Sequence, residues 1–90
     1  MKKLTQFTEE NAMQIAKLLK EEYDRFHVLE DKVIINLKEK NGREQSVYIY
    51  PTGQVSFLYN DGEPGGSGYK DINALPITDY LREQGFEFKY

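Results

Sequence analysis

The sequence predicts an α+β fold in which an N-terminal helix, a three-stranded antiparallel meander, a short C-terminal helix and a fourth edge strand form one domain over residues 1–90. Three observations predict it. Apolar residues recur with a helical period after Thr8, they alternate with a period of two from Lys32 to Tyr59, and a short proline-led helical repeat ends at Gly85. A chain of 90 residues can bury only one small core, so we expect the helices to cover the meander.

The first helix is predicted from apolar residues at three- and four-residue spacing. These residues are Ala12, Ile15, Leu18, Leu19, Tyr23 and Phe26. Thr8 suits the N-cap, and Glu21 is placed to pair with Arg25 in the last turns. Residues 27–31 then form a connector. Its His27 has no cysteine and no recognisable serine or carboxylate partner, so we expect a surface or structural histidine.

Two turns set the register of the meander. At Asn41-Gly42 a two-residue loop would place Lys40 opposite Arg43, whereas a three-residue loop would pair Glu39 with Arg43. Opposite charges are favourable across a ladder, so we expect the three-residue loop. At Pro51-Thr52-Gly53 a three-residue loop is also expected, because Pro51 fixes φ and Gly53 accepts a left-handed conformation.

This register sorts the strand residues into two faces. The predicted core face holds Val33, Ile35, Leu37, Val47, Ile49, Val55, Phe57 and Tyr59. The opposite face holds Ile34, Tyr48, Tyr50 and Leu58 among Lys32, Asn36, Ser46, Gln54 and Ser56. There are two interpretations of these apolar residues. In the first, they simply suit a pleated surface or are covered by a chain terminus. In the second, they form a docking surface.

The stretch from Asn60 to Gly68 is predicted to be a long glycine-rich loop. A loop of this kind is either a flexible connector or a ligand loop. The residues that would bind a small molecule or nucleotide are Asp61, Glu63, Gly65, Gly66, Ser67, Gly68 and Tyr69. The phosphate-loop lysine pattern and the twelve-residue calcium spacing are both absent from it, and its two acids would repel an anion.

The C-terminal segment is predicted to contain a helix and a strand. Pro76 suits the first position of a helix that runs to Gln84, and Gly85 is a natural stop. Residues 86–90 alternate with a period of two, which predicts a short edge strand whose three aromatic residues are packed.

Composition excludes some classes of function. The chain has no cysteine and one histidine, so we expect no metal, no cofactor and no catalytic set. The net charge of −3 is spread along the chain, which gives no argument for nucleic acid and favours a protein partner, a basic one included. No apolar run suggests a signal peptide or a membrane span, so the expected location is cytoplasmic.

The order helix, meander, helix, with Gly66-Ser67-Gly68-Tyr69-Lys70 before the second helix, resembles the double-stranded-RNA-binding domain. That family has a lysine cluster at this point, whereas Asp71, Ile72 and Asn73 follow Lys70 here. The departure removes the main electrostatic term for RNA. The layout is also similar in outline to phage-encoded inhibitors such as anti-CRISPR proteins, and to small immunity or antitoxin proteins.

We therefore expect a non-enzymatic protein that occludes or sequesters a partner, with self-association as a further option. The expected contact residues are Ile34, Asn36, Tyr48, Tyr50, Ser56 and Leu58. The alternative is a small-molecule or nucleotide binder that uses the glycine-rich loop. An enzyme that uses Asp61 and Glu63 as a carboxylate pair ranks third.

Overall fold

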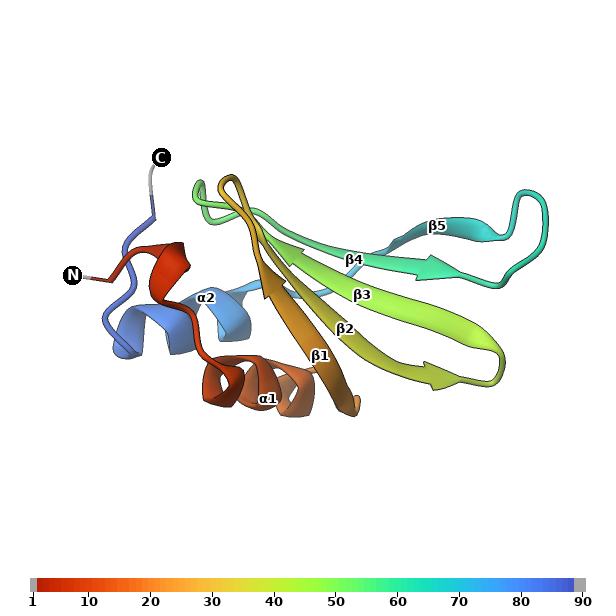
Figure 1. Cartoon of the computed structure of the whole chain (residues 1–90), viewed down its shortest axis with the longest axis horizontal. Helices are drawn as coiled ribbons and strands as arrows, with labels where there is room; N and C mark the ends of the chain where they lie inside the picture. Colours follow the sequence, from red (N-terminus) through yellow and green to blue (C-terminus); the bar gives the residue numbers. More distant parts are fainter. Residues whose placement is uncertain (1, 89–90) are drawn as a thin grey trace.

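The computed structural model describes residues 2–88 and confirms the α+β fold. The elements follow in the order η1 (Leu4–Gln6), α1 (Glu9–Leu18), β1 (Tyr23–Val28), β2 (Val33–Lys40), β3 (Arg43–Ile49), β4 (Val55–Asn60), β5 (Ser67–Lys70) and α2 (Leu75–Glu83). The five strands form one antiparallel meander in sequence order (Figure 1). The three predicted strands are therefore the middle of a wider sheet.

The first helix is shorter than predicted. Lys20 adopts a φ of 59°, and the Glu21 N–H donates to the Ala16 carbonyl while the Lys20 N–H donates to the Lys17 carbonyl. These two bonds form a Schellman motif, which ends a helix. The prediction of a helix through Tyr23 and Phe26 was wrong, and with it the helical pairing of Glu21 with Arg25.

Residues 23–28 form strand β1 instead. Phe26 pairs with Ile35 and Val28 with Val33, so β1 adds apolar side chains to the core face of β2. Tyr23 and Phe26 fit the three-residue helical spacing, but an irregularity between Tyr23 and Arg25 also brings both of them to one side of a strand.

The register in the middle of the sheet is as predicted. Val33 pairs with Ile49, Ile35 with Val47, Val47 with Phe57 and Ile49 with Val55. The three-residue turn at Pro51-Thr52-Gly53 is confirmed, because Gly53 has a φ of 89° and Tyr50 and Gln54 bond across the turn.

The predicted three-residue turn at Asn41-Gly42 was wrong. Asn41 and Gly42 both have positive φ, 54° and 78°, and Lys40 pairs with Arg43. The two like charges do not face each other unpaired, because Lys40 contacts Glu21 at 3.6 Å and Arg43 contacts Asp61 at 2.6 Å. An irregularity between Leu37 and Lys40 restores the predicted register beyond the turn.

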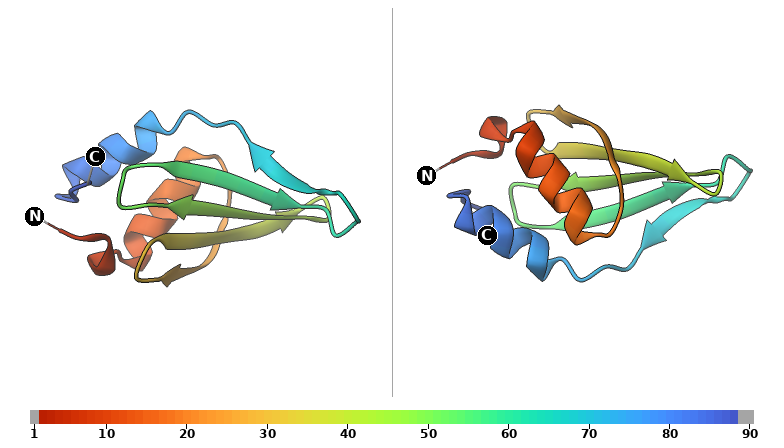
Figure 2. Two further views of the ribbon diagram at one scale, coloured as in Figure 1. Left: turned by 90° about the horizontal axis from the view of Figure 1, so that it is seen from above. Right: turned by 90° about the horizontal axis from the view of Figure 1, so that it is seen from below.

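The core lies between the sheet and the two helices. α1 crosses one face of the sheet, and neither helix lies over the other face (Figure 2). We call the covered side the inner face. Its buried strand residues are Val33, Ile35, Leu37, Gln45, Val47, Ile49 and Phe57, and α1 and α2 contribute Ala12, Ile15, Ala16, Ile77 and Leu81. Each fully buried large aliphatic side chain contributes about 1.5–3 kcal/mol through removal from water.

The C-terminal segment folds back on the N-terminus. Gly85 has a φ of 94° and ends α2, as expected for this residue type. Phe86 then forms a single parallel bridge with Lys2 and packs its ring 6.0 Å from the ring of Phe7. The predicted edge strand over residues 86–90 does not join the sheet within the described residues, and residues 89 and 90 lie outside them.

Candidate functional site

The first candidate site is the side of the sheet that neither α1 nor α2 covers, which we call the outer face. Its residues come from all five strands and follow from the strand pairing. They are Arg25 and His27 of β1, Ile34 and Asn36 of β2, Ser46 and Tyr48 of β3, Ser56 and Leu58 of β4, and Tyr69 of β5, with Tyr50 beside them. The six predicted contact residues therefore share one surface.

The outer face is apolar at its centre and polar between the apolar side chains. Ile34, Tyr48, Tyr50 and Leu58 are half-buried, and Tyr69 is 75% exposed. Ser46 donates a hydrogen bond to the Asn36 side-chain oxygen at 3.0 Å, which orders the polar pair. This mixture of aromatic, aliphatic and uncharged polar residues is typical of the centre of a protein interface.

Basic side chains border this face. The Lys32 amino group lies 5.9 Å from the centre of the Tyr50 ring and 3.2 Å from the Asp31 carboxylate. Arg25 and His27 are exposed on β1. Sequence reasoning missed these two outer-face residues because it placed Arg25 in a helix and His27 in a connector.

The glycine-rich stretch is a hairpin rather than an open loop. The Gly66 N–H donates to the Glu63 carbonyl around Pro64-Gly65, and Gly65 has a φ of 77°, as in a type II turn. The N–H groups of Asp61 and Gly62 donate to Gly66 and to the Asn60 side chain. These three N–H groups are already used within the hairpin, so they are not gathered around a phosphate.

The hairpin also separates the residues of the predicted ligand loop. Tyr69 pairs with Leu58 and lies on the outer face, whereas Asp61 and Glu63 line a hollow on the inner side. Asp61 accepts two hydrogen bonds from Arg43 and forms an ion pair with it. The predicted carboxylate pair is thus divided between a structural ion pair and an exposed turn residue.

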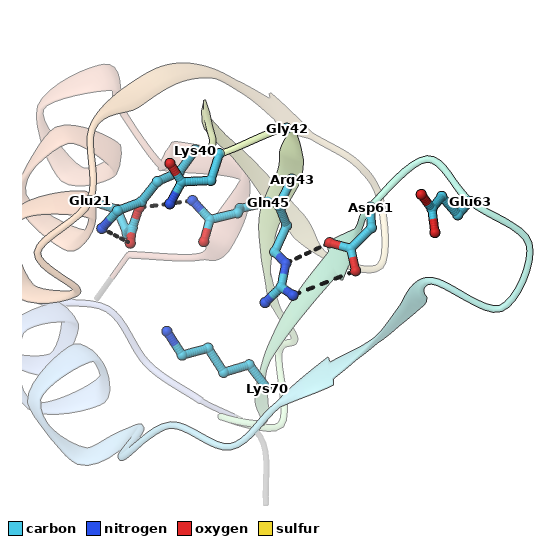
Figure 3. A pocket seen from close by; sticks show the side chains of 9 residues that line it. Glu21, Lys40, Gly42, Arg43, Gln45, Asp61, Glu63 and Lys70 are labelled. Atoms are coloured by element: carbon cyan, nitrogen blue, oxygen red, sulfur yellow. Dashed lines mark hydrogen bonds and ion pairs between the residues drawn. The ribbon is translucent and has the colours of Figure 1, made fainter.

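That hollow is the second candidate site (Figure 3). We call it the distal hollow, because it occupies the inner face where the sheet extends beyond the helices. Its volume is about 660 Å³, and it is lined by Glu21, Lys40, Asn41, Gly42, Arg43, Gln45, Asp61, Glu63 and Lys70. Nothing in the linear sequence brings these residues together, because they come from the end of α1 and from two separate hairpins.

Two titratable side chains have a pKa shifted from the ordinary value. The hydrogen bond to Asp61 raises the pKa of Arg43 above its ordinary value. Burial, and then the nearby Glu9 carboxylate, raise the pKa of Tyr23. Neither shift produces a group that titrates near neutral pH. Between residues 2 and 88, no three histidine, aspartate or glutamate side chains are grouped to hold a metal ion.

Comparisons with protein-family models, curated proteins and solved structures found no match. No helix in the described part of the chain has the length and apolar character to cross a membrane.

Proposed function

We propose that this protein is a small non-catalytic binding protein that occludes or sequesters a protein partner through its outer face. The observation that supports this proposal is the asymmetry of the sheet. α1 crosses the inner face and neither helix lies over the outer face, yet the outer face carries Ile34, Tyr48, Tyr50 and Leu58 as well. An apolar surface that no element of its own chain covers commonly serves as a contact surface.

The expected contacts follow from the side chains. Tyr48, Tyr50 and the exposed Tyr69 supply aromatic area with a polar tip, and residues of this type contribute most of the affinity in many interfaces. Asn36 and Ser56 lie between them and can hydrogen-bond to the partner. This is the mode of action of inhibitors, immunity proteins and antitoxins, which block a partner stoichiometrically.

The test first identifies the partner by cross-linking from defined positions on the chain, and then measures the affinity of the chain for that partner. Benzoylphenylalanine introduced at Tyr48 should cross-link to one discrete protein in an extract of the producing cells, whereas the same group at the exposed Met13 of α1 should not. The Tyr48→Ser/Tyr50→Ser variant should then bind that protein at least about 100-fold more weakly, since aromatic hot spots are worth 2 kcal/mol or more each.

The matched control is the Met13→Ser/Leu75→Ser variant, which removes two exposed apolar side chains from the helices. Its affinity for the partner should equal that of the natural chain. A partner that binds both variants equally well, or that cross-links only from Met13, would contradict the proposal. If the partner is a second copy of this chain, sedimentation equilibrium should show a dimer that the tyrosine substitutions dissociate.

A further inference from the structure

The distal hollow carries two side chains whose cationic groups are not fully used by the fold. The molecule measures 41 × 23 × 23 Å, and the hairpins of β2–β3 and β4–β5 extend along its long axis beyond the helices (Figure 1). The inner face of this extension is open. Its volume of about 660 Å³ lies within the range of small-molecule sites.

Most of the charges in the hollow are already paired. The Glu21 side chain is 9% exposed. It accepts a hydrogen bond from Gln45 at 2.8 Å and forms an ion pair with Lys40 at 3.6 Å. Asp61 is occupied by Arg43. Glu63 sits on the turn of the β4–β5 hairpin, with its carboxylate away from the other side chains of the hollow (Figure 3).

Arg43 is held in place with part of its guanidinium free. Its guanidinium carbon lies 4.3 Å from the centre of the Tyr59 ring. Nε donates to Asp61 at 2.6 Å and Nη2 donates to the same carboxylate at 3.5 Å. The remaining nitrogen, Nη1, takes part in neither bond and faces the hollow (Figure 3). A guanidinium fixed in this way can donate to an oxyanion with little loss of side-chain entropy.

Lys70 approaches the same space from β5. Its amino group lies 5.1 Å from the centre of the buried Phe57 ring and is directed into the hollow (Figure 3). Among residues 2–88 the structure gives Lys70 no carboxylate partner within ion-pair distance. An amino group over an aromatic floor and a free guanidinium edge that line the same hollow favour a negatively charged occupant.

We propose that the distal hollow binds the phosphate or carboxylate group of a small molecule between Arg43 Nη1 and Lys70 Nζ. Asp61 and Tyr59 act as positioning residues, because they hold the guanidinium of Arg43. The site is separate from the outer face, which lies on the other side of the sheet, and it does not use the glycine-rich turn.

The test is a titration of ¹⁵N-labelled protein with inorganic phosphate and, in a second arm, with citrate. Both probes are followed by chemical shifts at low ionic strength. Saturable shifts should appear in the Arg43 side-chain N–H signals and in the backbone of Lys70 and Gln45. The arm with the tighter binding identifies the group that the hollow prefers.

Variants separate a built site from general attraction to cations. Lys70→Gln and Arg43→Lys should each weaken binding by about tenfold or more. The first removes the charged amino group, and the second removes the guanidinium and its fixed N–H donors. Lys32→Gln, which removes a lysine from the opposite side of the sheet, should leave the dissociation constant within about twofold, because the Lys32 charge is already paired with Asp31 and does not line the hollow. Tyr48→Ser/Tyr50→Ser should also leave it unchanged.

Three results would overturn the proposal. They are non-saturable shifts with both probes, an equal loss of affinity in Lys32→Gln and Lys70→Gln, and binding that Arg43→Lys does not weaken. Lys70 is exposed on a short edge strand, so its substitution should not unfold the chain, and a urea titration of each variant verifies this.

Discussion

At Lys20 the backbone adopts a φ of 59° to end α1, a conformation that costs a residue with a Cβ about 1 kcal/mol or more. Glycine carries no such cost at the C′ position of a helix. We therefore expect Lys20→Gly to stabilise the protein by about 0.5–1 kcal/mol, measured as an increase in the urea midpoint at unchanged slope.

The control for this substitution is Lys17→Gly, within the same helix. It should destabilise by about 0.5–1 kcal/mol, because Lys17 keeps helical backbone angles in the last turn of α1 and glycine there loses more conformational entropy on folding. If Lys20→Gly were as destabilising as Lys17→Gly, the helix would have to continue beyond Leu18.

The charge pattern around Asn41 shows what single residues can and cannot predict. By local rules, cross-strand pairing of Glu39 with Arg43 is better than pairing of Lys40 with Arg43, since only the former joins opposite charges. The observed turn pairs the lysine with the arginine because each has another carboxylate, Glu21 or Asp61. Those partners are distant in sequence, so local rules could not include them.

At the scale of elements, α1 and α2 are joined by one buried amide. Asn11 completes the capping box of α1 with Thr8 and donates to the Tyr80 hydroxyl of α2 at 3.0 Å. Asn11→Ala should cost about 1.5–3 kcal/mol of unfolding free energy, because it removes both interactions. Tyr80→Phe removes only the link between the helices and should cost about 0.5–1.5 kcal/mol.

Chemical denaturation of the two variants and of the double variant tests this link. The double variant should be at most a few tenths of a kcal/mol less stable than Asn11→Ala, since the two residues share one hydrogen bond. Full additivity of the two losses would show that the hydrogen bond between the helices contributes nothing.

Strand β1 meets α1 through Tyr23, whose hydroxyl donates to Glu9 at 3.3 Å. Burial and the Glu9 carboxylate raise the pKa of Tyr23, so the folded chain holds the phenolic proton more tightly than the unfolded chain does. The resulting stabilisation is complete below a pH of about 10 and is lost as the pH rises through the folded pKa. As the pH rises above about 10, the stability of Tyr23→Phe should therefore fall less than the stability of the natural chain.

Thermal unfolding at a series of alkaline pH values measures this difference. Glu9→Gln should reduce the pH dependence only in part, because burial is the larger cause of the shift. Parallel stability curves for Tyr23→Phe and the natural chain would contradict the contact between β1 and α1.

The elements divide into those that the sequence predicts and those that it does not. The middle strands are predicted because residues 33–59 are rich in β-branched and aromatic residues, and the expected pairing places Ile35, Val47 and Phe57 on one face. β1 is missed because no glycine marks the end of α1. β5 is missed because the glycine-rich composition of residues 65–68 is typical of a loop, and only pairing with β4 makes it a strand.

At the scale of the whole molecule, the two candidate sites arise from incomplete coverage of one sheet. Strand alternation predicts which residues of β2, β3 and β4 leave the core, so the centre of the outer face was predictable. The distal hollow was not, because its existence depends on how far the hairpins extend beyond helices whose lengths the sequence does not define.

Accessibility of the two faces is the most direct test of this account. The chain has no cysteine, so single-cysteine variants report one position at a time. In the folded protein, Tyr48→Cys and Leu58→Cys should react with a thiol reagent without prior unfolding, because both positions are partly exposed. Val47→Cys and Phe57→Cys should react only as fast as the chain unfolds. Equal protection at all four positions would contradict an open outer face.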